Sequence, residues 1–283
     1  MTGRFAIYAA PGTGSADPAA TLLRERAEQW LGRSVAGDPV APGVPAGWTR
    51  EAVDAITVSA RRYGFHGTLK APFRLAPGRT PEELDAALAQ FAAARERVLV
   101  PRLRVARMGA FFALIPGAGA TEETEVREEA GVGEETEVGE EVEEATAGAA
   151  ELYALADEVV TAFDGFRDPS TEAEFARRDP VSLTPRQREL LRAWGYPYVL
   201  DEFRFHLTVT DRIPPAQQPA VERTLNRWFA ASLGVTVPVD AIALFSEAEP
   251  GAQFTLRAVH PLHSGVPTRA ARASQRAPGR PGA

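Results

Sequence analysis

Hydrophobic and polar positions alternate along several short stretches of the chain, and between these stretches apolar residues recur at helical spacing. The alternating stretches are rich in β-branched and aromatic residues and predict strands at residues 4–10, 63–75, 203–213, 237–247 and 253–262, with two more inside 97–117. Several of the helical stretches begin at Asp or Thr followed by Pro, and several end at Gly, which predicts helices at residues 17–32, 80–96, 150–163, 184–195 and 219–234. The pattern therefore predicts an α+β fold.

The predicted elements form two halves of the same kind. Each half contains one strand with the sequence Phe-His-x-Thr, at Phe65–Thr68 in the first half and at Phe205–Thr208 in the second. The chain has only four histidines, so two of them occupy the same local frame at equivalent places. Internal repetition of this kind predicts two similar lobes packed face to face.

The repeated sequence places residues that could do chemistry on one side of each strand. Side chains alternate along a strand, so His66 and Thr68 point the same way, and so do His206 and Thr208. If the lobes are related by a pseudo-two-fold axis, these four catalytic candidates meet across a central cleft. One histidine could accept a proton and the other donate one, while the threonine hydroxyls bind phosphate oxygens. A single His-x-Thr is most often structural, but two copies at equivalent places favour metal-independent cleavage of a phosphodiester.

Lys70 is a candidate for binding substrate. It is the only lysine among 31 basic residues. Counting along a regular strand places it on the same side as His66 and Thr68, where its compact ammonium could bind a phosphate in a space too tight for arginine. A lysine without a function is the alternative.

Three further residues are weaker candidates for substrate binding. Arg204 shares a strand side with His206, and Tyr8 lies on the first predicted strand. Tyr198, in the sequence WGYPYVL, could stack on a sugar or base, or fill the boundary between the lobes.

Charge is distributed unevenly along the chain and sets the expected domain boundaries. The net charge is −7, but 12 Glu and one Arg lie between Thr121 and Glu144. We expect residues 1–262 to form one bilobal domain, interrupted by a disordered acidic insert at 120–148 and followed by a disordered Arg/Pro/Gly-rich tail at 263–283. No binding partner for the insert is predicted.

Composition excludes several classes of function. The chain has no cysteine, so disulfides and thiolate chemistry are absent. No stretch is long and apolar enough for a signal peptide or membrane span, which predicts a cytoplasmic protein without a membrane partner. Outside the acidic insert there is no broad basic surplus, which argues against a nucleic-acid partner. No dinucleotide fingerprint or P-loop occurs, and we expect neither a cofactor nor a metal.

The paired motifs resemble those of the two-histidine (2H) phosphoesterase superfamily. The sequences RRYGFHGTLKAPFRL, LTPRQRELLRAWGYPYV and FRFHLTVTDRI are more closely similar to a branch encoded in bacterial phosphonate-utilisation operons. The resemblance covers residues 4–262 without the insert. It implies a duplicated bilobal fold with two antiparallel sheets facing a central cleft and helices outside. It also implies catalysis by the two His-Thr pairs without a metal.

The resemblance implies a cyclic phosphodiesterase acting on a small phosphorylated substrate. The operon association suggests ribosyl 1,2-cyclic phosphate. Two alternatives remain open from the residues, namely processing of 2′,3′-cyclic phosphates at RNA ends and non-catalytic binding of a phosphorylated ligand. Two intact proton-transfer groups favour an enzyme over a sensor.

Overall fold

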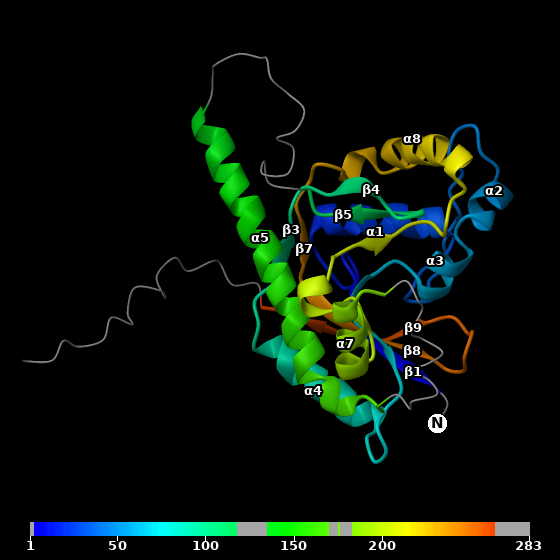
Figure 1. Ribbon diagram of the computed structural model, residues 1–283. Helices are drawn as coiled ribbons and strands as arrows, with labels where there is room; N and C mark the ends of the chain where they lie inside the picture. Colours follow the sequence, from blue (N-terminus) through cyan, green and yellow to red (C-terminus); the bar gives the residue numbers. More distant parts are fainter. Residues whose placement is uncertain (1–2, 118–134, 170–174, 176–182, 264–283) are drawn as a thin grey trace, which may run out of the picture.

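The computed structural model describes residues 3–117, 135–169, 175 and 183–263 (Figure 1). The strands are β1 (Arg4–Ala9), β2 (Gly67–Phe73), β3 (Val98–Val100), β4 (Arg104–Met108), β5 (Phe111–Ile115), β6 (Leu207–Thr208), β7 (Val237–Val239), β8 (Ala241–Glu247) and β9 (Thr255–Pro261). The α-helices are α1 (Pro18–Leu31), α2 (Arg50–Ala55), α3 (Val58–Tyr63), α4 (Pro81–Ala93), α5 (Glu135–Ala162), α7 (Pro185–Trp194) and α8 (Gln218–Trp228). Short 3₁₀ helices are η1 (Asp164–Phe166), η2 (Leu200–Glu202), η3 (Pro215–Gln217) and η4 (Ala230–Ser232).

One large antiparallel sheet organises the fold. Its strand order is β4-β5-β6-β2-β1-β8-β9, and β3 pairs with β7 in a separate two-stranded sheet. The predicted α+β class is confirmed. The two motif strands, β2 and β6, are neighbours within the large sheet instead of belonging to two sheets that face each other.

The strand order also departs from the order of the two sequence halves. Strand β1 lies between β2 of the first half and β8 of the second, and β6 of the second half lies between β2 and β5 of the first. Strands from both halves are therefore interleaved. The periodicity of a strand shows which of its faces is apolar, but its hydrogen-bonded neighbour is decided by the packing of the whole chain.

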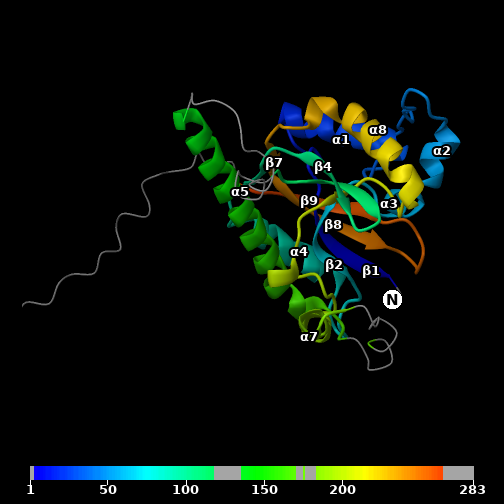
Figure 2. The same ribbon diagram turned by 45° about the horizontal axis from the view of Figure 1, so that its top comes forward.

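Four helices cover one face of the large sheet (Figures 1 and 2). Helices α1, α4, α5 and α8 share one hydrophobic core with the alternate residues Phe5, Ile7 and Ala9 of β1. The intervening residues Ala6 and Tyr8 face the other side of the sheet, where a second cluster forms. Among the helices that the structure describes, none combines the length and apolarity required to cross a membrane.

Local signals placed several helix ends correctly. Thr80 and Thr184 each form a capping box at the start of α4 and α7, and Asp17 caps α1 through the N–H of Ala20. Helices α2 and α3 were not predicted, because the segment before the first histidine has no long amphipathic run.

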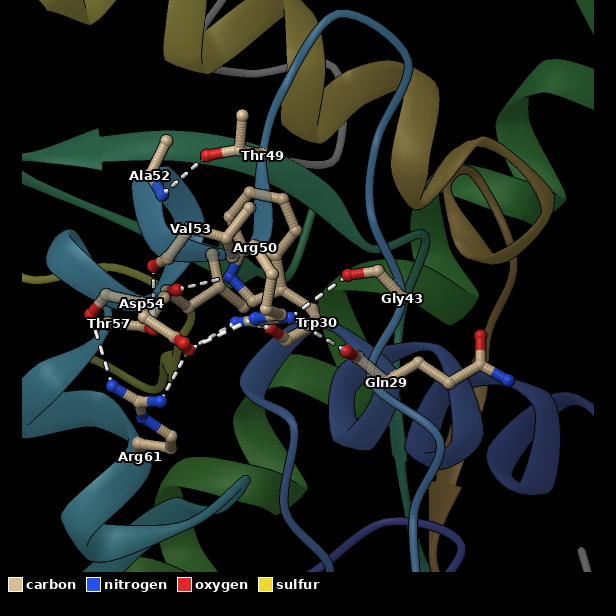
Figure 3. A network of polar contacts seen from close by, with 11 residues as sticks. Gln29, Trp30, Gly43, Thr49, Arg50, Ala52, Val53, Asp54, Thr57 and Arg61 are labelled. Carbon is tan, nitrogen blue, oxygen red and sulfur yellow. Dashed lines mark hydrogen bonds and ion pairs between the residues drawn. The ribbon is translucent and has the colours of Figure 1, made fainter.

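A polar network around Arg50 holds α2 and α3 in place (Figure 3). The Arg50 guanidinium donates to the carbonyls of Trp30 (2.9 Å) and Gly43 (3.0 Å), and it pairs with Asp54 (2.8 Å). Asp54 also binds Arg61 of α3. The network thus links the end of α1, the following loop, α2 and α3, and it fixes α3 beside the motif strands.

Parts of the segments expected to be disordered lie outside the described residues. Residues 120–134 of the acidic segment and 264–283 of the tail are not described. Helix α5 begins at Glu135, so the later part of the predicted insert has helical backbone. His263 is described, and its backbone bridges to Glu96.

Candidate functional site

The two Phe-His-x-Thr sequences lie side by side. Gly67 of β2 is directly opposite Leu207 of β6 in an antiparallel pair. Opposite residues of such a pair point to the same face, and successive residues alternate. The histidines and threonines of both motifs therefore share the other face of the sheet: His66, Thr68, His206 and Thr208.

Gly67 allows the two strands to pack closely. A Cβ atom at this position would lie 2.5 and 2.7 Å from two ring carbons of Phe205 and 3.2 Å from a methyl group of Leu207. Phe205 and its counterpart Phe65 are both buried in the main core. The need for glycine at this position was not predicted from the sequence. The signal that could have shown it is the third position of the motif, which is Gly67 in FHGT but Leu207 in FHLT.

Both histidines are held by the same backbone contact. Nδ1 of His66 lies 2.8 Å from the carbonyl oxygen of Gly64, and Nδ1 of His206 lies 2.7 Å from that of Arg204. A carbonyl oxygen only accepts, so each Nδ1 carries the hydrogen, and Nε2 of each neutral ring is the acceptor. The Thr68 hydroxyl donates to Nε2 of His66 at 3.2 Å.

Each imidazole also has an aromatic neighbour from an adjacent strand. The Tyr8 ring of β1 stacks on His66, with ring centroids 3.8 Å apart and planes inclined by 26°. The Phe111 ring of β5 lies 5.9 Å from that of His206. Tyr8 is fully buried, and this burial raises the pKa of its hydroxyl well above the usual value. Tyr8 thus lies at the site, as a neutral support for His66.

Burial keeps both imidazoles neutral at pH 7. It lowers the pKa of His66 to about 4; the Gly64 carbonyl opposes this shift, and the nearby His206 adds to it. Burial also lowers the pKa of His206, with the Arg204 carbonyl opposing. Both rings can therefore act as proton acceptors. A phosphate anion beside them would raise both pKa values and allow one ring to become a proton donor.

A divided cleft opens above the motif strands. One part, of about 740 Å³, is lined by residues that include Tyr8, Tyr63, His66 and Thr208. The other, of about 480 Å³, is lined by residues that include Tyr198, Arg204 and His206. Both parts share Thr68, Ala71, Phe111 and Tyr196. Within the described residues, no three His, Asp or Glu side chains cluster as metal ligands, and we assign no metal site.

Lys70 does not share the side of Thr68, contrary to the prediction. Thr68 is opposite Tyr8 of β1 but Lys70 is opposite Ile7, so one extra residue, Leu69, is accommodated by a β-bulge. The bulge turns Lys70 toward α5. There its buried ammonium donates to the carbonyl of Val160 at 3.0 Å and pairs with Asp164 at 3.3 Å.

Two other predicted binding residues, Arg204 and Tyr198, line the 480 Å³ part of the cleft. Arg204 is exposed, and its guanidinium donates to the carbonyls of Asp201 (3.2 Å) and Phe203 (2.6 Å). Tyr198 is 46% exposed and packs edge-on against Tyr196. Tyr196, which was not among the predicted binding residues, borders both parts of the cleft. Its position two residues before Tyr198, in the sequence WGYPYVL, was the signal that could have identified it.

Comparison with known protein families shows which family the chain belongs to. A family of proteins of unknown function, DUF1045, matches residues 68–130 and 143–255, which is more than half of the chain. The chain belongs to the DUF1045 family. The matched segments include Thr68, His206 and Thr208 and begin two residues after His66.

Two similar proteins share one name. The chain is 34% identical over 260 residues to the ribose 1,5-bisphosphate phosphokinase PhnN of Janthinobacterium sp. (strain Marseille), covering 89% of this chain and 49% of that protein. It is 32% identical over 254 residues to the protein of the same name from Laribacter hongkongensis (strain HLHK9), covering 89% and 50%. The DUF1045 chain therefore spans about half the length of the curated relatives it matches.

These matches correct the predicted function. They tie the DUF1045 chain to phosphonate-operon-associated proteins, as the resemblance implied. Both relatives are named as kinases, so the expected cyclic phosphodiesterase is contradicted. The alternatives that accompanied it, RNA-end processing and non-catalytic ligand binding, are likewise not what these names state.

Proposed function

We propose that the chain is an enzyme module that binds a phosphorylated ribose in the divided cleft. In this proposal His66 and His206 transfer protons at oxygens of the bound sugar phosphate during phosphoryl transfer. The observation that carries it is the matched anchoring of the two rings, each by Nδ1 to a carbonyl two residues earlier. This contact orients two neutral acceptor nitrogens toward one face of one strand pair.

The chemistry of the cleft supports a phosphate ligand. The Thr68 and Thr208 hydroxyls lie on the same face as the two imidazoles. The Thr208 hydroxyl can donate to a phosphate oxygen, and the Thr68 hydroxyl can do so once the ligand replaces its bond to His66. The printed name of both relatives specifies a phosphorylated ribose, ribose 1,5-bisphosphate. The resemblance of the motif strands to the two-histidine superfamily supports the same use of the histidines in proton transfer.

The kinase name concerns proteins about twice as long as the matched region. The chain's only lysine follows Leu69, so the sequence contains no G-x-x-x-x-G-K-[ST] P-loop. We therefore propose that this chain holds the phosphorylated ribose as the phosphoryl acceptor and that a nucleoside triphosphate donor is bound by contacts other than a P-loop.

Binding and histidine signals test the proposal together. The four histidines can be followed by NMR while ribose 5-phosphate or ribose 1,5-bisphosphate is added, and affinity can be measured by calorimetry. We expect the His66 and His206 signals to shift and their pKa values to rise, while the NMR signal of the exposed His263 keeps its position.

Matched variants distinguish the loss of a contact in the cleft from a general effect of substitution on the protein. His66→Gln and His206→Gln should each weaken binding roughly tenfold or more, because each removes a contact to a charged group. His263→Gln should bind like the wild type. The proposal fails if neither sugar phosphate binds at millimolar concentration, or if both cleft variants retain the wild-type affinity.

A further inference from the structure

A second cavity lies beside the cleft and is lined by cationic side chains. Strand β6 is only two residues long, so it pairs with the start of β2. Among the described residues, no strand pairs with the later part of β2 on that side. The cavity forms at this part of β2, next to the ends of α5 and α7. Four cationic residues line it: Arg4, Lys70, Arg74 and Arg167.

Lys70 is the most buried of these cations, at 4% exposure. Its ammonium has three N–H donors. Among the described residues, the Val160 carbonyl and the Asp164 carboxylate take two of them, at 3.0 and 3.3 Å. Burial lowers the pKa of Lys70 to about 8, although Asp164 opposes the shift. The ammonium is therefore mostly charged at pH 7, and an additional anion would stabilise this form.

The carboxylates in this region are shared between cations. Asp164 pairs with both Lys70 and Arg167, at 3.3 and 2.7 Å. Glu247 pairs with Arg4 at 2.5 Å and also with Arg62. Burial would raise the pKa of Glu247, but its hydrogen bonds from the two arginines and from the Gly251 N–H lower it to about 2, so it is ionised.

Positive charge therefore exceeds negative charge around the cavity. The remaining carboxylate, Asp168, lies 3.7 Å from Arg74. Among the described residues, the four cations that line the cavity contact three carboxylates, Asp164, Asp168 and Glu247, and Glu247 is shared with Arg62. A confined positive surplus with guanidinium donors favours a phosphate group.

The size and position of the cavity limit what it can hold. Its free volume of about 30 Å³ exceeds the roughly 10–15 Å³ needed for one water molecule and suits a compact oxyanion better than a sugar or base. It shares Ala71, Pro72 and Tyr196 with the cleft. Ala71 is three residues from Thr68, or at most roughly 10 Å along β2 because the bulge at Leu69 shortens the strand, and a pentose with a phosphate at each end has a comparable length.

We propose that this basic cavity binds the second phosphate of a bisphosphorylated sugar whose first phosphate lies between His66 and His206. The inference rests on the proposed function and adds that the two phosphates of the ligand are bound at separate places. It also gives the single lysine, Lys70, a function away from the histidines.

The presence of only one lysine gives a direct test. Protein labelled with ¹³C and ¹⁵N in lysine alone has one lysine side-chain signal, which reports on Lys70. Adding inorganic phosphate should shift this signal and raise the pKa of Lys70 by about one unit or more, whereas chloride at the same ionic strength should not. Ribose 1,5-bisphosphate should shift it at lower concentration than ribose 5-phosphate.

Variants and histidine signals separate the two proposals. Arg167→Gln and Arg74→Gln should each reduce the preference for the bisphosphate at least fivefold, and Arg223→Gln on the exposed face of α8 should not. If the bisphosphate shifts the cleft histidines but leaves Lys70 unchanged, the second-phosphate site is wrong and the proposed function stands. If inorganic phosphate shifts Lys70 while no ribose phosphate affects the histidines, the anion site is supported and the proposed function fails.

Discussion

Replacing Gly67 with alanine tests whether the site depends on the close approach of β2 and β6. The added Cβ would lie 2.5 and 2.7 Å from the ring of Phe205, closer than van der Waals contact allows. Phe205 and Leu207 are 2% and 0% exposed, so neither side chain can move into solvent. Overpacking of this kind costs about 1–3 kcal/mol. At about 2–4 °C per kcal/mol for a chain of this size, we expect the melting temperature of Gly67→Ala to fall by roughly 3–10 °C.

Thermal unfolding followed by circular dichroism measures this change. Gly165→Ala is the matched control, because a Cβ there has no heavy atom within 4 Å and its backbone φ is not positive. The control should unfold within about 1 °C of the wild type. Strand separation should also reduce the influence of His206 on His66, so the pKa of His66 should move upward in Gly67→Ala. Equal melting temperatures for the wild type and Gly67→Ala would refute this account of the strand pair.

Three other expectations follow from individual contacts. Because the pKa of His66 is lowered from 6.5 to about 4, the unfolded chain binds the proton first, and stability should fall by up to about 3 kcal/mol as pH drops from 6.5 to 4. Urea unfolding should show a shallower pH dependence for His66→Gln; parallel curves would contradict the assignment. The Asp211 carboxylate accepts from two N–H groups at the start of α3, so Asp211→Ala should cost about 1–2 kcal/mol in urea, and Asp211→Asn less. The buried Trp30 indole donates to the carbonyl of Val209 at 2.7 Å, so Trp30→Phe should cost about 1–3 kcal/mol, and an unchanged urea midpoint would show that this bond contributes nothing.

Helix boundaries were predictable because their causes are local. Thr80 and Thr184 bind N–H groups only three residues away, and Gly32 and Gly195 end their helices with positive φ. Such contacts need no distant partner, so the sequence carries the whole signal. The short helices α2 and α3 lacked a comparable signal, since the Arg50 network that holds them depends on carbonyls of the preceding helix and loop.

The candidate site was predictable for the residues that follow a regular strand period. The alternation of side chains was sufficient to place His66 with Thr68 and His206 with Thr208. The same rule failed at Lys70, because the bulge at Leu69 interrupts the period. A bulge is visible only once the partner strand is known, and here that partner is β1, about sixty residues away in the sequence.

The sequence by itself determined the α+β class, most helix ends, and the sharing of one strand face by each histidine and its threonine. Hydrogen bonds and side-chain periods between near neighbours specify these features. Tertiary structure alone decided that the two motif strands are adjacent in one sheet, that Tyr8 supports His66, and that Lys70 faces a separate cavity. Those features depend on which distant strands pair and in what register, and a strand's pattern of apolar residues is compatible with many partners until the whole core is packed.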